Sequence, residues 1–325
     1  MIYTISKDGY SGDLINALNS LIAGDTLIVH EGVYDCGSAP FTFNYKSERG
    51  RGITIKGADG ERVEFTGATP GTTVRIDYAE FLNLENLVLS IHSANPVIKF
   101  IAGMNINFTN IEIDGKNISK QGIAGGNVDA LPGIHDCTFA GVKIHNNTDH
   151  GFKLYYAASN FVFDACEFYN NACDGFSGRS NRDDKNHGRN MVFRNTSFHD
   201  NGQDGVDVGI KDGVVLFDNC SAERNGFSGY KFWNTNTVML NCSMADNFYG
   251  MSVKPLWGDP AKIHFVNCKL AGTHKWGTVV FNASSGENII GPVVGYLYNT
   301  EITTSYPDGR LINVENPNAE VITVC

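Results

Sequence analysis

Three stretches of the chain repeat one pattern, FVFDACEFYNNACDGF (residues 161–176), MVFRNTSFHDNGQDGV (191–206) and VLFDNCSAERNGFSGY (215–230). Each begins with alternating apolar residues and ends in an asparagine-containing turn that is followed by a residue–glycine pair. Alternation of this kind predicts short strands, and Asn and Gly favour the tight turns that join them. Each copy can therefore supply the same strands and the same turn.

Extending the alignment in both directions gives a register of eight positions, spaced by 24, 26, 29, 30, 24, 22 and 26 residues. Such intervals are typical of a solenoid, in which coils stacked about 4.8 Å apart share a core that no single coil can form. We expect the cysteines of this register to form one column of reduced, buried side chains. The positions are Leu87, Ile111, Cys137, Cys166, Thr196, Cys220, Cys242 and Cys268.

The two ends of the chain fit the same architecture. Residues 13–22, DLINALNSLI, have apolar side chains at helical spacing and predict a short helix that caps the core, with Asp13 as its N-cap. Residues 291–325 predict the last coils or a C-terminal cap. No linker or shift in composition interrupts residues 1–325. The sequence therefore predicts an all-β, single-domain right-handed parallel β-helix with an N-terminal capping helix.

The turns contribute a second column of like residues. Asparagines recur three residues before the residue–glycine pairs, and stacked amide side chains can hydrogen-bond from coil to coil. We therefore expect an asparagine ladder made of Asn147, Asn171, Asn201 and Asn225.

Charge and hydropathy exclude two classes of partner. The net charge of −10 and the pI near 5.3 leave no basic stripe that could neutralise nucleic-acid phosphates. No apolar run is long enough to span a membrane, and residues 1–10 lack the apolar region of a signal peptide. The protein is therefore expected either to be cytoplasmic or to have had its signal peptide removed.

The residue–glycine pairs align residues that can carry chemistry. The pairs begin with His150, Asp174, Asp204, Ser228 and Tyr249. Three residues further on, the equivalent positions hold Lys153, Ser177, Asp207, Lys231 and Ser252. Three aspartates and Lys231 should therefore face one surface within about 10 Å.

Crowded carboxylates raise one another's pKa unless a cation lies among them. Calcium prefers six to eight oxygen ligands. One Asp-Gly pair alone would be ordinary turn chemistry, but the stacked set predicts a calcium site at Asp174, Asp204 and Asp207. For Lys231, the charge of Asp207 should raise the pKa of the amine, whereas burial and a nearby calcium ion should lower it.

The segments CDGF (173–176), NGQDGVDV (201–208) and GFSGYKFW (226–233) resemble the family 9 polysaccharide lyases, pectate lyases built as right-handed parallel β-helices. The resemblance covers about residues 147–247. It implies calcium ligands at Asp174, Asp204 and Asp207, and a catalytic base at Lys231.

Two positions depart from the family pattern. Gln203 stands where the family has the first of two adjacent aspartates, which removes one charge; Gln203 is therefore a further candidate ligand. The family's GFK segment is matched here by GYK, whereas a closer match, GFKL, lies at residues 151–154. Lys153 is therefore a rival for the role of base, although the family places its base after the acidic segment.

The resemblance implies a calcium-dependent lyase that cleaves pectate or another uronic-acid polymer by β-elimination. Arginines in the longest insertion between coils could pair with substrate carboxylates. The expected substrate-binding residues are Arg179, Arg182, Arg189, Lys153 and Tyr230. We expect an acidic polysaccharide as the partner, a monomer, and a secreted, extracellular or periplasmic location.

Other functions on the same fold stay open. Residues 147–149, Asp183-Asp184 and His187-Gly188 resemble parts of the inverting polygalacturonases, although their spacing differs from that family. A uronate epimerase would use the same proton abstraction as a lyase. A non-catalytic carbohydrate-binding β-helix would need neither Lys153 nor Lys231.

Overall fold

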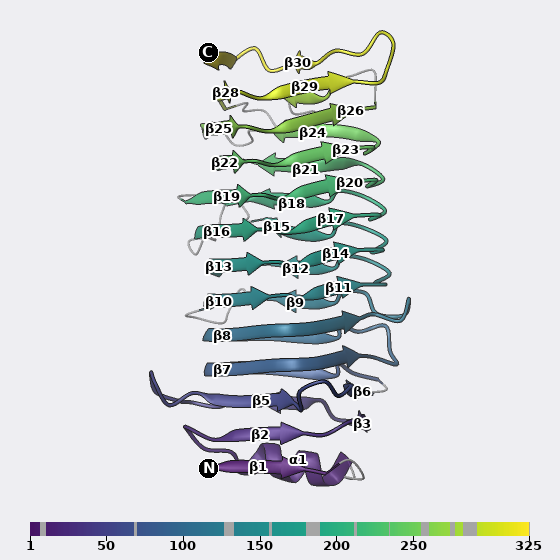
Figure 1. Cartoon of the computed structure of the whole chain (residues 1–325), viewed down its shortest axis with the longest axis vertical. Coiled ribbons are helices and arrows are strands. Elements are labelled where there is room, and N and C mark those ends of the chain that lie inside the picture. Colours follow the sequence, from purple (N-terminus) through teal and green to yellow (C-terminus); the bar gives the residue numbers. More distant parts are fainter. Residues whose placement is uncertain are drawn as a thin grey trace.

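The structure is a computed structural model and describes residues 1–6, 11–67, 70–126, 133–155, 158–179, 189–210, 213–233, 235–254, 260–273, 277–281 and 291–324. In this part of the chain, parallel strands follow one another around a right-handed coil that rises from the amino end to the carboxyl end (Figure 1). The one helix among the described residues lies near the amino end. The predicted parallel β-helix is therefore confirmed.

The strands form three faces, and each strand pairs in parallel with its equivalents in the coils before and after it. The long strands β7 (Val74–Ser90) and β8 (Ile98–Asp114) run through all three faces. The first face also contains β4 (Phe41–Phe43), β9 (Ile123–Gly125), β12 (Phe152–Leu154), β15 (Phe176–Arg179), β18 (Val206–Gly209), β21 (Ser228–Trp233), β24 (Tyr249–Lys254), β27 (Val279–Phe281) and β30 (Ile312–Val314). The second contains β1 (Ile2–Ile5), β2 (Thr26–Val29), β5 (Ile53–Gly57), β10 (Ile134–Ala140), β13 (Ala158–Asp164), β16 (Arg189–Arg194), β19 (Val214–Asp218), β22 (Asn236–Leu240), β25 (Ala261–Val266), β28 (Val293–Tyr298) and β31 (Ala319–Val324). The third contains β3 (Gly32–Asp35), β6 (Val63–Thr66), β11 (Lys143–His145), β14 (Glu167–Tyr169), β17 (Ser197–His199), β20 (Ser221–Glu223), β23 (Ser243–Ala245), β26 (Lys269–Gly272) and β29 (Glu301–Thr304).

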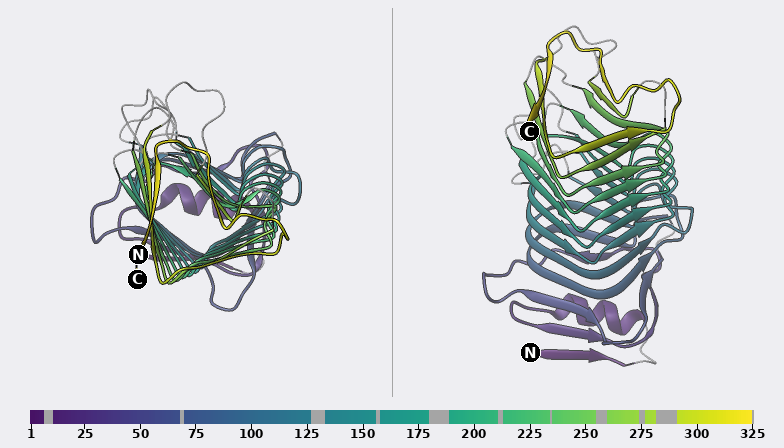
Figure 2. Two further views of the ribbon diagram at one scale, coloured as in Figure 1. Left: turned by 90° about the horizontal axis from the view of Figure 1, so that it is seen from above. Right: turned by 45° about the horizontal axis from the view of Figure 1, so that its top comes forward.

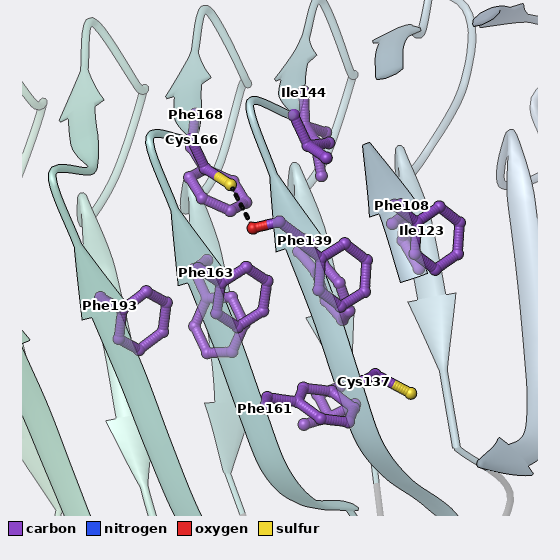
Figure 3. Packing of buried hydrophobic residues seen from close by; sticks show 14 of the residues in the cluster. Phe108, Ile123, Cys137, Phe139, Ile144, Phe161, Phe163, Cys166, Phe168 and Phe193 are labelled. Atoms are coloured by element: carbon purple, nitrogen blue, oxygen red, sulfur yellow. Dashed lines mark hydrogen bonds between the residues drawn. The ribbon is translucent and has the colours of Figure 1, made fainter. Parts of the chain in front are cut away.

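Columns of like side chains fill the space between the faces. The rings of Phe108, Phe139, Phe163 and Phe193 stack from coil to coil, with centroids 4.6, 4.8 and 4.7 Å apart (Figure 3). Phe217 continues this column, 4.9 Å from Phe193. This spacing matches the distance between paired strands, so strand pairing and ring stacking reinforce each other.

The cysteine column is confirmed with one correction. Cys166 aligns with Thr196 and Cys220 because the residues that follow them pair in register. The equivalent position one coil earlier is occupied by Val142, whereas Cys137 lies in β10 and pairs with Phe161 on another face. The prediction for Cys137 was therefore wrong, because its coil was aligned by residue type, whereas the strand register places Val142 at the equivalent position.

Six of the seven described cysteines are buried, as expected of core residues, whereas Cys173 is partly exposed. No disulfide joins any two of these seven residues, which are Cys36, Cys137, Cys166, Cys173, Cys220, Cys242 and Cys268. Burial raises the pKa of the Cys137 and Cys166 thiols to about 12. Figure 3 shows the Cys166 thiol donating to the Phe139 carbonyl, at 3.3 Å. These thiols therefore serve as small buried side chains.

The amino-terminal helix α1 spans Ser11–Ser20 and covers the open end of the core (Figure 2). Leu14 and Leu18 are buried beneath it. The helix begins and ends two residues earlier than predicted, so Asp13 lies in its first turn and is not the N-cap. An acidic side chain there still interacts favourably with the helix dipole.

The predicted asparagine ladder is present and continues to Asn247. Asn147 Nδ2 donates to Asn171 Oδ1 at 2.7 Å, and the same bond recurs in the next three coils at 2.9, 2.9 and 2.8 Å. All these side chains are buried. The ladder fixes the turns that lead into the first face.

Replacing Asn201 with alanine should lower the free energy of unfolding by about 3 kcal/mol, because it leaves buried polar groups unpaired. Asn201 Nδ2 donates to the Phe168 carbonyl, and its Oδ1 accepts from Asn171. Urea denaturation measures the effect. Replacement of the exposed Asn236 with alanine is the control and should change stability by less than about 0.5 kcal/mol. Equal effects of the two substitutions would contradict a structural role for the ladder.

Candidate functional site

The candidate site lies on the outer side of the first face, where alternate residues of each strand point away from the core. The parallel register aligns Lys153 with Ser177, Ser177 with Asp207, Asp207 with Lys231, and Lys231 with Ser252. The structure therefore contains the column that the sequence repeat predicts.

Three aspartates meet in the middle of this region. Asp174 and Asp204 lie in the turns before β15 and β18, and Asp207 lies within β18. One carboxylate oxygen from each lies within 4.8 Å of the others, and the three residues are 1%, 4% and 1% exposed. Buried carboxylates this close together are costly unless hydrogen bonds and positive charge compensate them.

Backbone amides of the next coil hold two of the carboxylates. The Asp204 N–H donates to Asp174 Oδ1 at 3.1 Å, and the Ser228 N–H donates to Asp204 Oδ1 at 2.8 Å. Asp174 and Asp204 are therefore positioned by the coil stacked above each of them. Because these bonds come from the strand register, the fold itself creates the acid cluster (Asp174, Asp204 and Asp207).

Lys231 brings a positive charge to the cluster. Its Nζ lies 2.8 Å from Asp204 Oδ2 and 3.2 Å from Asp207 Oδ2. Trp233 follows on the same side of β21; its Nε1 donates to Asp207 Oδ1, and its ring centroid lies 5.2 Å from Lys231 Nζ. The lysine side chain is 18% exposed, so it can meet a molecule that approaches from solvent.

A second basic group flanks the cluster on its amino-terminal side. His150 Nδ1 lies 3.1 Å from Asp174 Oδ2, and Lys153 Nζ lies 3.0 Å from His150 Nε2 and 3.1 Å from Ser177 Oγ. The Asp174 backbone N–H also donates to His150 Nδ1, at 3.3 Å, and His150 Nε2 lies 3.2 Å from Asp149 Oδ1. Lys153 is thus linked to the acid cluster through His150, whereas Lys231 contacts it directly.

Burial and charge shift the pKa values of these groups in different directions. Burial, with the charges of Asp174 and Asp207, raises the pKa of Asp204 even though Lys231 opposes it. Burial also favours a higher pKa for Asp174, but the hydrogen bond and charge of His150 lower it overall. For Lys231, burial lowers the pKa of the amine, yet the charges of Asp207 and Asp204 outweigh burial and raise it. The cluster therefore holds more negative charge than its neighbours balance.

A cavity of about 490 Å³ opens beside Lys231 on the carboxyl-terminal side of the cluster. It gives Asp204 and Lys231 access to solvent. The residues that line it include Gln203, Asp204, Phe227, Ser228, Lys231, Tyr249, Ser252, Lys254 and Glu315. A cavity of this size matches the volume of ordinary ligand sites.

Comparison with known proteins supports the coil architecture. A family profile described as "Right handed beta helix region" matches residues 184–300. The described strands of this region belong to the parallel β-helix. A search of curated proteins found no match.

Several solved structures share the β-helix over nearly the whole chain. Pectate lyase Pel9A is 15% identical, with a TM-score of 0.61 over 98% of this chain and 78% of that one. An alginate lyase from Paenibacillus sp. str. FPU-7 is 13% identical, with a TM-score of 0.54 over 97% and 99%. The catalytic domain of a GH87 α-1,3-glucanase is 12% identical, with a TM-score of 0.63 over 99% and 68%. At these identities the likeness establishes the fold and leaves the activity to be argued from the site.

The remaining predicted residues have different outcomes. Gln203 is exposed and lines the cavity next to Asp204. Tyr230 was expected to bind substrate, but this prediction is wrong: its side chain is fully buried, and its hydroxyl donates to the Ser243 carbonyl at 3.4 Å. Because side chains alternate along a strand, an outward Lys231 requires an inward Tyr230.

Several other predicted residues lie outside the described part of the chain. Arg182 belongs to this group, as do the side chains of Arg179 and Arg189, whose backbones end β15 and begin β16. Residues 183–188, which carry the hydrolase-like segments, also lie outside it. Asp149 is described, and its Oδ2 accepts from Gln121 Nε2 at 2.6 Å.

No site role was predicted from the sequence for Trp233, Lys254 or Phe227. Trp233 was identifiable in principle, since it lies two residues after Lys231 and therefore on the same side of the strand. Lys254 pairs in register with Trp233 and lines the cavity. Among the described residues, no helix is long and apolar enough to cross a membrane.

Proposed function

We propose that this protein is a calcium-dependent polysaccharide lyase that cleaves a uronic-acid polymer by β-elimination, with Lys231 as the base. The observation that carries the proposal is the buried acid cluster in direct contact with Lys231, at the edge of an open cavity. The β-helix neighbours that are named as pectate and alginate lyases support the same class of substrate.

The acid cluster fits calcium in charge and in ligand type. Three carboxylates facing the Lys231 ammonium group leave two uncompensated negative charges, the charge that one calcium ion balances. All three aspartates offer hard oxygen ligands, which calcium prefers. When bound, calcium would neutralise a substrate carboxylate and stabilise the negative charge that develops next to it during proton removal.

The protein's own residues account for the proton transfer. The neutral Lys231 amine takes the proton from C5 of the uronate, the C5–H electron pair forms the C4–C5 double bond, and the C4–O bond to the next sugar breaks. The departing oxygen then takes a proton from water or a neighbouring side chain. Because the aspartate charges keep Lys231 protonated, compensation of those charges on loading the site would lower the pKa of the amine and release the base.

The geometry favours elimination over the hydrolytic alternative. Inverting hydrolases separate their two carboxyl groups by about 6.5–9.5 Å to admit a water molecule. The oxygens of the acid cluster lie within 4.8 Å of one another, and Lys231 contacts two of the carboxylates.

We further propose that the protein acts as a secreted monomer, because polymers of this class lie outside the cytoplasm.

Incubation with several uronic-acid polymers, with added calcium or with chelator, tests the proposed function. A lyase leaves a C4–C5 unsaturated sugar that absorbs in the ultraviolet, so absorbance should rise with calcium and stay flat with chelator. No rise with any of the polymers would contradict a lyase. A rise that persists in chelator would contradict the role of calcium.

Replacing Gln203 with aspartate should tighten calcium binding roughly tenfold, because it adds a carboxylate beside Asp204 in the same cavity. Isothermal titration calorimetry measures the change. Asn236→Asp, which adds the same charge at an exposed position on the second face, is the control and should leave the affinity unchanged. Unchanged affinity in Gln203→Asp would show that residue 203 points away from the metal.

A further inference from the structure

Two phenylalanines are exposed next to the candidate site. Phe227 and Phe248 are 46% and 53% exposed, whereas the other phenylalanines that the structure describes are buried, apart from the partly exposed Phe81. Exposing an aromatic ring to water costs free energy, so neighbouring exposed rings indicate a surface that binds something.

These two rings form a cluster with Tyr249. The ring centroids of Phe227 and Tyr249 lie 5.8 Å apart, those of Phe227 and Phe248 6.4 Å, and those of Phe248 and Tyr249 4.7 Å. Phe227 lies in the turn before β21, and Phe248 in the turn before β24. The stacked turns therefore present one aromatic platform (Phe227, Phe248 and Tyr249).

Two rings of the platform and one carboxylate of the acid cluster line the same cavity. Phe227 and Tyr249 line the same cavity of about 490 Å³ as Asp204 and Lys231. Lys254 lines it too, and its Nζ lies 5.4 Å from the Trp233 ring. An occupant of this cavity therefore meets aromatic rings and the ammonium groups of Lys231 and Lys254, together with the carboxylates of Asp204 and Glu315.

We propose that the aromatic platform binds the C–H face of a uronate ring, next to the sugar whose proton Lys231 removes. A pyranose ring has polar edges and apolar faces, and its C–H groups pack well against the electron-rich face of an aromatic ring. The Lys254 ammonium group would receive the carboxylate of the bound uronate. This inference rests on the proposed function and assigns the platform to positioning and substrate specificity.

The size of the cavity favours a sugar over a protein partner. Stable protein–protein interfaces bury more than about 1,000 Å², and they do not require a buried acid cluster at their edge. A cavity of about 490 Å³ matches the volume of small-ligand sites and continues into the acid cluster.

The test compares binding and turnover in variants of the platform. Phe227→Ala combined with Phe248→Ala should raise both KM and the Kd for a saturated oligogalacturonate roughly tenfold, because two stacking contacts are lost. Calorimetry in the Lys231→Ala background gives the Kd without cleavage. The kcat of the platform variant, with Lys231 intact, should stay within about threefold. Replacing both phenylalanines with tyrosine should restore binding.

Tyr78→Ala is the matched control, since Tyr78 is an exposed aromatic residue of β7, several coils toward the amino end, and it should leave Kd unchanged. An unchanged Kd in the double alanine variant would overturn the platform, as would a loss that tyrosine does not rescue. Equal affinity for a neutral oligoglucan would overturn the assignment to a uronate. If the intact protein yields no unsaturated product but the alanine variant loses oligogalacturonate binding, the lyase proposal fails and the platform stands.

Discussion

Replacing Lys231 with alanine should lower kcat by roughly 10³-fold, because a general base in a proton-abstraction step contributes about 10²–10⁴-fold. The amine lies 2.8 Å from Asp204 and is partly exposed to the cavity, so it is placed to meet a substrate proton. The release of unsaturated product at saturating substrate and calcium measures the effect. Circular dichroism verifies that the fold is retained.

Two further substitutions distinguish whether Lys231 acts as a base or only as an ion-pair partner of the aspartates. Lys231→Arg keeps the positive charge opposite Asp204 and Asp207 but stays protonated, so it should also be inactive. Lys153→Ala should lose less activity and mainly through a higher KM, because Lys153 contacts His150 and Ser177. An inactive Lys153→Ala protein together with an active Lys231→Ala protein would show that the base lies on the amino-terminal side of the cluster.

Replacing Asp204 with asparagine should weaken calcium binding by at least roughly 100-fold and remove most activity. Loss of a residue that merely supports a metal ligand costs about 10–100-fold in affinity, and loss of a ligand should cost no less. Asparagine retains an oxygen that can accept from the Ser228 N–H, so the turn should keep its shape. Calorimetry with calcium and a thermal melt provide the two measurements.

The exposed Asp308 supplies the matched control for this substitution. Asp308→Asn removes the same charge far along the chain from the acid cluster and should leave calcium affinity unchanged. If Asp204→Asn bound calcium as tightly as the unmodified protein, the acid cluster would not be the metal site, and Lys231 would be an ordinary ion-pair partner of buried acids.

Much of the site could be predicted because, in a stacked coil, residues that align between sequence repeats lie next to each other in the structure. Once the turns before Asp174 and Asp204 are aligned, the strand spacing brings their carboxylates together, and the period of two along each strand sets which residues face outward. Lys231 follows Asp207 by one coil for the same reason. In few other folds does the sequence indicate so directly which distant residues are neighbours.

The wrong predictions arose where a residue was placed by its type and not by the strand register or the alternation of side chains. Cys137 was aligned by residue type, but it pairs with Phe161 on the second face, and Val142 takes the position beside Cys166. Tyr230 was placed on the surface although its neighbour Lys231 already faced outward, so strand alternation contradicted that assignment from the start.

The aromatic platform could not be predicted from the sequence. Phenylalanine is the dominant core residue of this chain, and a phenylalanine in a turn has no periodic pattern that separates a buried ring from an exposed one. Only the geometry of the turns shows that Phe227 and Phe248 project into solvent. The pairing of Trp233 with Asp207 also depends on the rotamers of both side chains.

The most direct test of elimination is digestion of a uronic-acid polymer in water labelled with heavy oxygen, followed by mass spectrometry of the products. Elimination breaks the C4–O bond without adding water, so every new non-reducing end should be unsaturated and the products should carry no label from the cleavage step once exchange at reducing ends is corrected with a standard. Labelled reducing ends opposite saturated non-reducing ends would mean hydrolysis. That result would contradict Lys231 as the base of a lyase.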